Sequence, residues 1–164
     1  MKSLLLLRHG KSSWKDPSLS DDQRPLKKRG RRAATRMGEE IQNRNFIPGL
    51  VVSSPAKRAR QTARRVLDQL DSEDPLTIRP ELYFEGSSAY LRVAAEQGGT
   101  HESILLVGHN PDLEEVVDRL TGAISLLLTH NLGHDVERDI IARTSEGTRT
   151  VWLTRSEDEG QTWS

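Results

Sequence analysis

The sequence LLLLRHG at residues 4–10 decides how the rest of the chain is interpreted. A short uninterrupted apolar run that ends in turn residues is typical of a strand buried on both faces. Two later stretches repeat this form: LVVSSP at residues 50–55 and ILLVGHNP at residues 104–111. Each run stops at residues suited to chemistry, so three strand ends carry candidate functional groups.

Helical patterns fill the gaps between these strands. Apolar side chains recur at helical spacing near residues 27–43 and 55–70, over 87–97, and in a shorter segment after Pro111. Strands that alternate with helices predict an α/β fold, a three-layer sandwich whose mostly parallel central sheet has helices on both faces. We expect residues 1–164 to form a single domain.

The C-terminal region has a different pattern. Residues 139–144 and 148–154 flank the turn sequence Ser145-Glu146-Gly147, which predicts a β-hairpin. The last ten residues are polar.

Composition narrows the possible classes of protein. The chain has 164 residues, of which 29% are charged and none is cysteine. The length suits one compact domain. The lack of cysteine excludes disulfide scaffolds, thiolate zinc sites and cysteine nucleophiles. The apolar run at residues 4–7 is too short for a signal-peptide core or a membrane span, so we expect a cytoplasmic protein without a membrane partner.

The charges cancel in total but are unevenly distributed. Residues 1–65 contain 17 Lys or Arg and 5 Asp or Glu, whereas residues 66–164 contain 7 and 19. Such an asymmetry indicates a nucleic-acid or membrane surface, or an anion site built by one part of the fold, and a run of charges can also be a solvated helix face. The segment KKRGRR at residues 27–32 is the candidate for nucleic-acid binding, but no aromatic residues interleave its cations and no recognition motif is present. Nucleic-acid binding is therefore a distant alternative, which a salt-dependent shift of labelled DNA or RNA would revive.

The three strand ends favour an anion site. Ligands of open α/β sheets bind at the carboxyl ends of the strands. This rule brings together Arg8 and His9 from the first strand, Arg58 from the helix after the second, and His109 from the third. Gly10 would let the backbone turn sharply beside His9, as a further phosphate-binding position. Two histidines and two arginines at one sheet edge are suited to phosphate.

Two helix starts add to this prediction. Ser54 is expected to cap a helix that begins at Pro55, and Asn110 to cap one that begins at Pro111 and to add to the phosphate site. Free N–H groups at a helix N-terminus favour phosphate. Arg58 would lie in the first helical turn, where a cation is unfavourable for its own helix, so an incoming anion would resolve that conflict.

Three segments together resemble the histidine phosphatase superfamily, also called the phosphoglycerate mutase-like fold. They are LLLLRHGKSSWKDPSLSDDQRPLKKRGRRAATRM at residues 4–37, SSPAKRARQTA at 53–63 and LLVGHNPDLEEVV at 105–117. The continuation after Gly10 is similar to the small branch of SixA-type phosphohistidine phosphatases. The resemblance covers residues 3–122, whereas residues 123–164 diverge from the family pattern.

The resemblance implies a phosphatase that transfers a phosphoryl group to His9 and then to water, without a metal or other cofactor. Arg8, Arg58 and His109 would hold the phosphoryl oxygens. The residues themselves agree with this assignment, because nearby guanidinium groups disfavour a protonated imidazole. The same cations would stabilise the charge on the transferred group.

The sequence constrains the substrate and the proton donor less than it constrains the phosphate-binding residues. Larger relatives supply an acidic residue after the middle strand, and Glu81 and Glu85 occupy that neighbourhood. Either could be the general acid, with a solvated loop as the alternative for both. The small branch lacks the insertions that form a lid over small substrates, so the resemblance implies an open site suited to phosphohistidine on proteins. A small-molecule phosphomonoesterase or sugar-phosphate phosphatase is the alternative on the same fold.

Overall fold

The computed structural model describes residues 3–70, 76–121 and 141–145. The second strand of the expected C-terminal hairpin, residues 148–154, lies outside the described residues. The first strand of that hairpin is expected at 139–144, and a strand is present at Ile141–Ser145.

A five-stranded sheet forms the centre of the described structure. Its strands are β1 (Ser3–Arg8), β2 (Leu50–Ser53), β3 (Thr77–Ile78), β4 (Ser103–Gly108) and β5 (Ile141–Ser145). They lie in the order β3-β2-β4-β1-β5, with β5 antiparallel to β1 and the other neighbours parallel. The three apolar runs of the sequence are therefore adjacent parallel strands, with β4 between β2 and β1.

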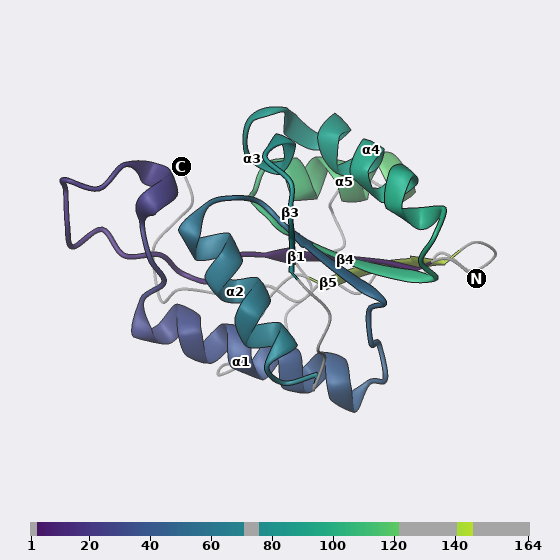
Figure 1. The fold of residues 1–164 in the computed structure, drawn as a ribbon, viewed down its shortest axis with the longest axis horizontal. Coiled ribbons are helices and arrows are strands. Elements are labelled where there is room, and N and C mark those ends of the chain that lie inside the picture. Colours follow the sequence, from purple (N-terminus) through teal and green to yellow (C-terminus); the bar gives the residue numbers. More distant parts are fainter. Residues whose placement is uncertain (1–2, 71–75, 122–140, 146–164) are drawn as a thin grey trace.

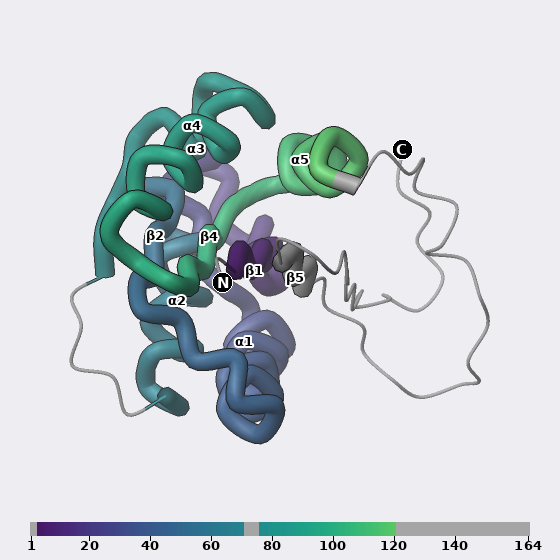
Figure 2. The backbone as a smooth tube through the Cα atoms, turned by 90° about the vertical axis from the view of Figure 1, so that its right-hand side faces the viewer, coloured from purple at the N-terminus to yellow at the C-terminus, as the bar shows by residue number. Residues whose placement is uncertain are grey.

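Helices cover both faces of this sheet. They are α1 (Lys28–Asn43), α2 (Lys57–Leu67), α3 (Glu81–Phe84), α4 (Gly86–Gly98) and α5 (Asp112–Thr121). Figure 1 shows α1 and α2 on one face and α3, α4 and α5 on the other. The view turned by 90° in Figure 2 shows the strands between the same two helical layers. The α/β sandwich expected from the sequence is confirmed.

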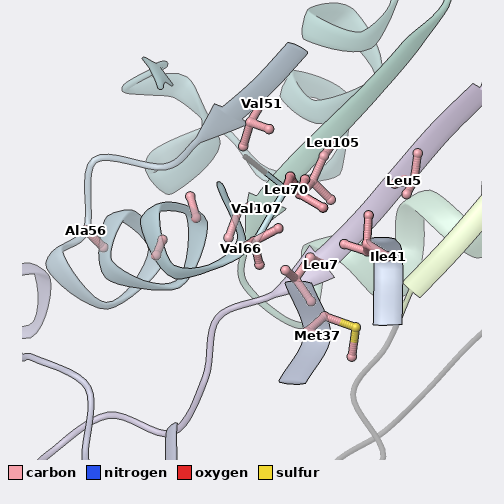
Figure 3. Packing of buried hydrophobic residues seen from close by; sticks show 12 residues of the cluster. Leu5, Leu7, Met37, Ile41, Val51, Ala56, Val66, Leu70, Leu105 and Val107 are labelled. Atoms are coloured by element: carbon pink, nitrogen blue, oxygen red, sulfur yellow. The ribbon is translucent and has the colours of Figure 1, made fainter. Parts of the chain in front are cut away.

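Consecutive residues of β1 enter opposite layers of the core. Leu5 and Leu7 pack with residues of α1 and α2, whereas Leu6 packs with residues of α3, α4 and α5. Figure 3 shows the first of these clusters, in which Met37 and Ile41 of α1 lie near the strand side chains. All three leucines are 1% exposed, and full burial of one leucine stabilises the fold by roughly 1.5–3 kcal/mol. Burial on both faces explains why the strand sequences are uninterrupted apolar runs.

Two helices begin later than the sequence suggests. α2 begins at Lys57 rather than Pro55, and its N-cap position is Ala56, which has no side-chain cap. Ser54 lies two residues before this N-cap position, and its Oγ accepts a hydrogen bond from the backbone N–H of Ala56 at 3.3 Å, so it caps the turn that leads into α2. α5 begins at Asp112 rather than Pro111. Asn110 lies in the turn that leads into α5.

Candidate active site

The carboxyl ends of β1, β2 and β4 meet at one edge of the sheet. Arg8 pairs in register with Gly108 as the last residue of β1. Beyond the strand, the backbone N–H of His9 donates to the carbonyl of Gly108 at 3.0 Å, and that of Ser54 donates to the carbonyl of Val107 at 3.0 Å. The segments that carry the candidate residues are thus held together by backbone hydrogen bonds, as the strand-end rule predicts.

The ring of His9 is fixed through both of its nitrogens. Its Nδ1 lies 2.8 Å from the carbonyl oxygen of Gly10, which can only accept a hydrogen bond, so Nδ1 carries the proton. Its Nε2 accepts a hydrogen bond from Nε of Arg58 at 3.1 Å. The assigned tautomer leaves a lone pair on Nε2, directed toward the guanidinium group.

Both histidines of the site are held in the neutral form. Burial lowers the pKa of His9 to about 3, helped by the charges of His109, Arg58 and Arg8 and opposed by the hydrogen bond to Gly10. Burial also lowers the pKa of His109 to about 4, with Arg58 and Arg8 acting in the same direction and Asp21 against it. The two rings lie with their centroids 5.0 Å apart. A protonated imidazole is thus disfavoured beside two guanidinium groups.

His109 is anchored by Ser54 and by a buried tyrosine. The Oγ of Ser54 lies 2.8 Å from Nε2 of His109. The hydroxyl of Tyr90, a fully buried side chain, accepts a hydrogen bond from the backbone N–H of His109 at 3.1 Å and donates to the carbonyl of Leu82 at 2.8 Å. A Cβ at Gly108 would lie 1.9 Å from that hydroxyl. Only glycine fits beside Tyr90 at this strand end.

Gly10 allows a close approach between two backbone segments. Among the described glycines, the positive φ belongs to Gly86, so Gly10 does not adopt the left-handed conformation that glycine favours. A Cβ at Gly10 would lie 2.6 Å from the carbonyl oxygen of Gly30 in α1, and a Cβ at Gly30 would lie 2.4 Å from the carbonyl oxygen of Lys11. The backbone N–H of Gly10 donates to Oγ1 of Thr62 at 3.0 Å. This packing holds the segment after β1 in close contact with α1 and α2.

Asn110 has a different partner from the one expected of a cap. Its Nδ2 donates to Oε1 of Glu114 at 2.5 Å, and its Oδ1 is buried without a hydrogen-bond partner.

Arg58 contacts both His9 and Asp21 and so forms the centre of a polar cluster. Asp21, its main partner, is not among the site residues that the sequence predicts. The side chain of Arg58 is 7% exposed. Its Nη1 donates to the backbone carbonyl of Asp21 at 2.5 Å and its Nη2 to Oδ2 of Asp21 at 2.7 Å. Asp21 lies in a short 3₁₀ helix, η1 (Asp21–Gln23). The carboxylate of Asp21 therefore offsets the unfavourable position of the Arg58 cation in the first turn of α2.

Tyr83 joins the same cluster from the other helical layer. Its hydroxyl donates to Oδ2 of Asp21 at 2.7 Å, and its ring centroid lies 5.2 Å from that of His109. The guanidinium carbon of Arg58 lies 5.8 Å from the centre of the Tyr83 ring. Periodicity gives no signal for Tyr83 or Asp21, because α3 and η1, in which they lie, are each too short to display a repeating pattern.

The two candidate acids are each paired with an arginine. Glu81 forms an ion pair with Arg79 at 2.5 Å, and the hydrogen bond from Arg79 is the main reason that the pKa of Glu81 is lowered. Glu85 forms an ion pair with Arg92 at 2.6 Å, and both of these side chains are about half exposed. Glu81 and Glu85 thus lie on either side of Tyr83 along the chain, with their carboxylates engaged by neighbouring cations.

Within residues 3–70, 76–121 and 141–145, no group of three or more His, Asp or Glu side chains is arranged to hold a metal ion. In the same part of the chain, no helix has the length and apolar character needed to cross a membrane.

Comparison with known proteins agrees with this geometry. Residues 4–83 match the histidine phosphatase superfamily, branch 1. An uncharacterised chloroplast protein of Arabidopsis thaliana is 34% identical over 139 residues, which cover 79% of this chain and 64% of that protein. The chain therefore spans less than two thirds of that relative's length.

Solved structures extend the likeness to the fold. SixA from Agrobacterium tumefaciens, assigned as a phosphohistidine phosphatase, is 32% identical and superposes with a TM-score of 0.69 over 74% of this chain and 77% of that one. A protein histidine phosphatase SixA in complex with tungstate is 26% identical, with a TM-score of 0.72 over 93% and 96%. Both the sequence identity and the superposed fold agree with these proteins. This chain belongs to the histidine phosphatase superfamily and is similar to its SixA-type members.

Proposed function

We propose that this protein is a phosphatase that acts through a phosphohistidine intermediate on His9, and that its substrate is phosphohistidine on proteins. One observation carries the proposal: Nδ1 of His9 donates its proton in a hydrogen bond to the carbonyl oxygen of Gly10, while Nε2 keeps its lone pair and faces Arg58. A neutral imidazole with a fixed tautomer is a ready nucleophile toward phosphorus.

The reaction consists of two displacements at phosphorus. In the first, Nε2 of His9 attacks the phosphoryl group, an N–P bond forms, and the bond from phosphorus to the leaving group breaks. In the second, water attacks the same phosphorus, the N–P bond breaks, and inorganic phosphate leaves with the imidazole restored. Dividing one displacement into two steps is the usual benefit of a covalent nucleophile.

Arg8, Arg58 and His109 are proposed to hold the phosphoryl oxygens. Both guanidinium groups influence the pKa values of His9 and His109, so their charges act at the site. Ser54 engages Nε2 of His109, which leaves Nδ1 as the ring nitrogen that can donate to an oxygen. Positioned donors that meet the charge of the transferred group are the main source of rate enhancement in phosphoryl transfer.

The remaining candidate positions have narrower roles. The amide Nδ2 of Asn110 is engaged by Glu114, so its contribution to phosphate binding requires release of that bond. Gly10 contributes by packing, since its N–H is bound by Thr62.

The SixA neighbours support phosphohistidine as the substrate. One of them is named as a protein histidine phosphatase and binds tungstate, a tetrahedral oxyanion like phosphate. Exposed aromatic side chains lie near the site in this chain: Phe84, 75% exposed, packs edge-on against Tyr83, and Trp14, 72% exposed, stacks on Arg24. Aromatic side chains left exposed in this way are typical of surfaces that meet a protein partner.

The general acid provides a test of the substrate class. An imidazole leaving group is less demanding than an alkoxide, so a phosphohistidine phosphatase needs Glu81 and Glu85 less than an alkyl phosphatase does. Glu81→Gln and Glu85→Gln are therefore expected to keep turnover of phosphohistidine protein. A loss of that turnover with either variant would assign the acid and show that hydrolysis of phosphohistidine depends on it, contrary to this expectation.

The proposal is tested by comparing two histidine variants. His9→Ala is expected to abolish hydrolysis of an aryl phosphate and of phosphohistidine protein. The matched control is His101→Ala, because His101 follows α4 and is bound by Gln97 and Thr100 outside the cluster. Activity that survives in His9→Ala would overturn the phosphatase proposal, and equal loss in both variants would attribute the effect to folding.

A further inference from the structure

We propose that Asp21 is a positioning residue that holds the guanidinium group of Arg58 in the orientation needed for phosphoryl transfer. This inference rests on the phosphatase function proposed above. It concerns a carboxylate that lies beside the reacting groups without being one of them.

The two ends of the Arg58 guanidinium group have different partners. The Nη end is bound by Asp21, because Nη1 donates to the carbonyl oxygen at 2.5 Å and Nη2 to Oδ2 at 2.7 Å. The Nε–H is directed at Nε2 of His9. A guanidinium group has five N–H donors, so two donors remain for phosphoryl oxygens. Asp21 thereby turns the Nε side of Arg58 toward the position at which the N–P bond would form.

Asp21 is itself held from two further directions. Nη1 of Arg24 donates to Oδ1 of Asp21 at 2.6 Å, and the hydroxyl of Tyr83 donates to Oδ2 at 2.7 Å. Arg24 is 6% exposed and is anchored by Oγ of Ser12 at 2.7 Å and by the carbonyl of Ser13 at 3.1 Å. The segment between β1 and α1 is therefore built to present this carboxylate to Arg58.

The charge of Asp21 is maintained at all ordinary pH values. Burial would raise the pKa of Asp21, but hydrogen bonds from Tyr83, Arg58 and Arg24 and the charge of Arg58 outweigh burial and lower the pKa to about 2. The carboxylate also raises the pKa of His109, opposing the two arginines. Asp21 thus orients one cation of the site and moderates the total positive charge on the histidines.

If Asp21 instead competed with the substrate for Arg58, its removal would affect kcat and KM differently. A carboxylate bound to Arg58 could act as an internal competitor of the substrate phosphate, in which case its removal would tighten substrate binding. A positioning residue instead acts in the transition state, so its removal lowers kcat more than it changes KM. The ratio of the two effects distinguishes these roles.

The first experiment compares neighbouring aspartates. Asp21→Asn keeps the shape of the side chain and removes its charge, whereas Asp22→Asn makes the same change at an aspartate bound to Ser20 and Gln23. Asp21→Asn is expected to lower kcat by about 10²-fold with KM changed much less, since small misplacements of a catalytic group have effects of this order. Asp22→Asn should lower kcat little, and Asp21→Glu should recover part of the loss by restoring the charge.

The second experiment asks whether Asp21 acts through Arg58. In an Arg58→Ala background, Asp21→Asn is expected to cause no further fall in the single-turnover rate of phosphoryl transfer, because the group that it orients is gone. An independent fall of equal size in both backgrounds would overturn the inference. So would an Asp21→Asn kcat equal to that of Asp22→Asn, or a lower KM at unchanged kcat.

The outcomes separate this inference from the proposed function. If His9→Ala retains activity, the phosphatase proposal fails and the Asp21 variants carry no meaning for phosphoryl transfer. If His9→Ala is inactive while Asp21→Asn matches the Asp22→Asn control, the function stands and the role of Asp21 is refuted. Thermal unfolding of each variant identifies any loss of kcat that follows from a loss of folded protein.

Discussion

The Nε of Arg58 lies 3.1 Å from the Nε2 of His9, although the two residues are separated by 49 positions in the sequence. A donor at this nitrogen requires that the imidazole keep its lone pair, and the guanidinium charge disfavours protonation of the ring. Burial, helped by this contact, thus keeps the ring neutral, and the contact itself fixes the direction of Nε2 and agrees with a proton on Nδ1.

The two site histidines are expected to remain neutral in mildly acidic solution. The pKa values of His9 and His109 are lowered to about 3 and about 4 from the usual 6.5. NMR of the ring nitrogens at pH 5 should show two neutral imidazoles that titrate only below that pH. Signals from both rings that titrate near pH 6.5 would contradict the burial argument.

The same shifts predict a pH dependence of stability. An unfolded histidine binds a proton below about pH 6.5, but these folded histidines do so only near pH 4 or 3, so stability is lost as pH falls through that window. Each neutral histidine contributes a slope of up to about 1.4 kcal/mol per pH unit. Urea denaturation between pH 6.5 and 4.5 measures this slope, and His109→Gln should make it shallower.

Tyr90→Phe is expected to destabilise the protein and to lower its activity. The change removes the hydroxyl that joins the backbone N–H of His109 to the carbonyl of Leu82, leaving both buried groups without that partner. The cost should be about 1–3 kcal/mol in the free energy of unfolding, measured by denaturant titration. Tyr83→Phe is the stability control, since its hydroxyl lies at a more exposed position. An equal effect on unfolding in both variants would refute the anchoring role of Tyr90.

Alanine at Gly10 or Gly30 is expected to destabilise the fold, in contrast to alanine at Gly98. A Cβ at either of the first two positions would lie within 2.6 Å of a backbone oxygen, whereas a Cβ at Gly98 in α4 would meet nothing within 4 Å. Overpacking typically costs 1–3 kcal/mol, while an exposed helical Gly→Ala change stabilises by up to ~1 kcal/mol. Thermal unfolding of the three variants gives the comparison, and a stable Gly10→Ala variant would contradict the close approach.

The cations around Arg8 are expected to speed capture of an acidic phosphoprotein. Burial lowers the pKa of Lys11, and the charges of Lys27, Arg29 and Arg8 act in the same direction. The backbone N–H of Lys27 also donates to the carbonyl of Lys11, the third residue after Arg8, at 2.8 Å. The double variant Lys27→Gln/Arg29→Gln should lower kcat/KM for the phosphoprotein at low salt, and the difference should shrink at high salt. Arg64→Gln, at the far end of α2, is the control. The kcat/KM for an aryl phosphate should fall less in the double variant. Equal falls for both substrates would show that these cations do not steer a protein partner.

The residues at the strand ends could be predicted from the sequence because the rule that places them is general. Buried parallel strands have apolar sequences on both faces, and their carboxyl ends share one edge of the sheet. Arg8, His9 and His109 follow such runs directly, so three catalytic candidates could be located without coordinates. Arg58 could be located because it lies in the first turn of the helix that follows the second strand end.

Asp21 could not be selected in this way. It lies next to Asp22 in a segment without helical or strand periodicity, and only the fold decides that Asp21 binds Arg58 while Asp22 binds Ser20 and Gln23. The contact between Ser54 and His109 could not be selected for a related reason: α2 begins two residues after Pro55, and the fold places the Ser54 hydroxyl where it both accepts from the Ala56 N–H and contacts His109. Positions in connecting segments depend on tertiary contacts that a single sequence does not display.

The central claim is that His9 carries the phosphoryl group, and a phosphoenzyme can be detected directly. Wild-type protein is mixed with substrate, quenched with alkali on the millisecond scale, digested and analysed by mass spectrometry. The account predicts one phosphoryl adduct on the peptide that contains His9, stable in base and lost in acid, and absent from His9→Ala. An adduct that maps to another residue, or one that persists in His9→Ala, would contradict it.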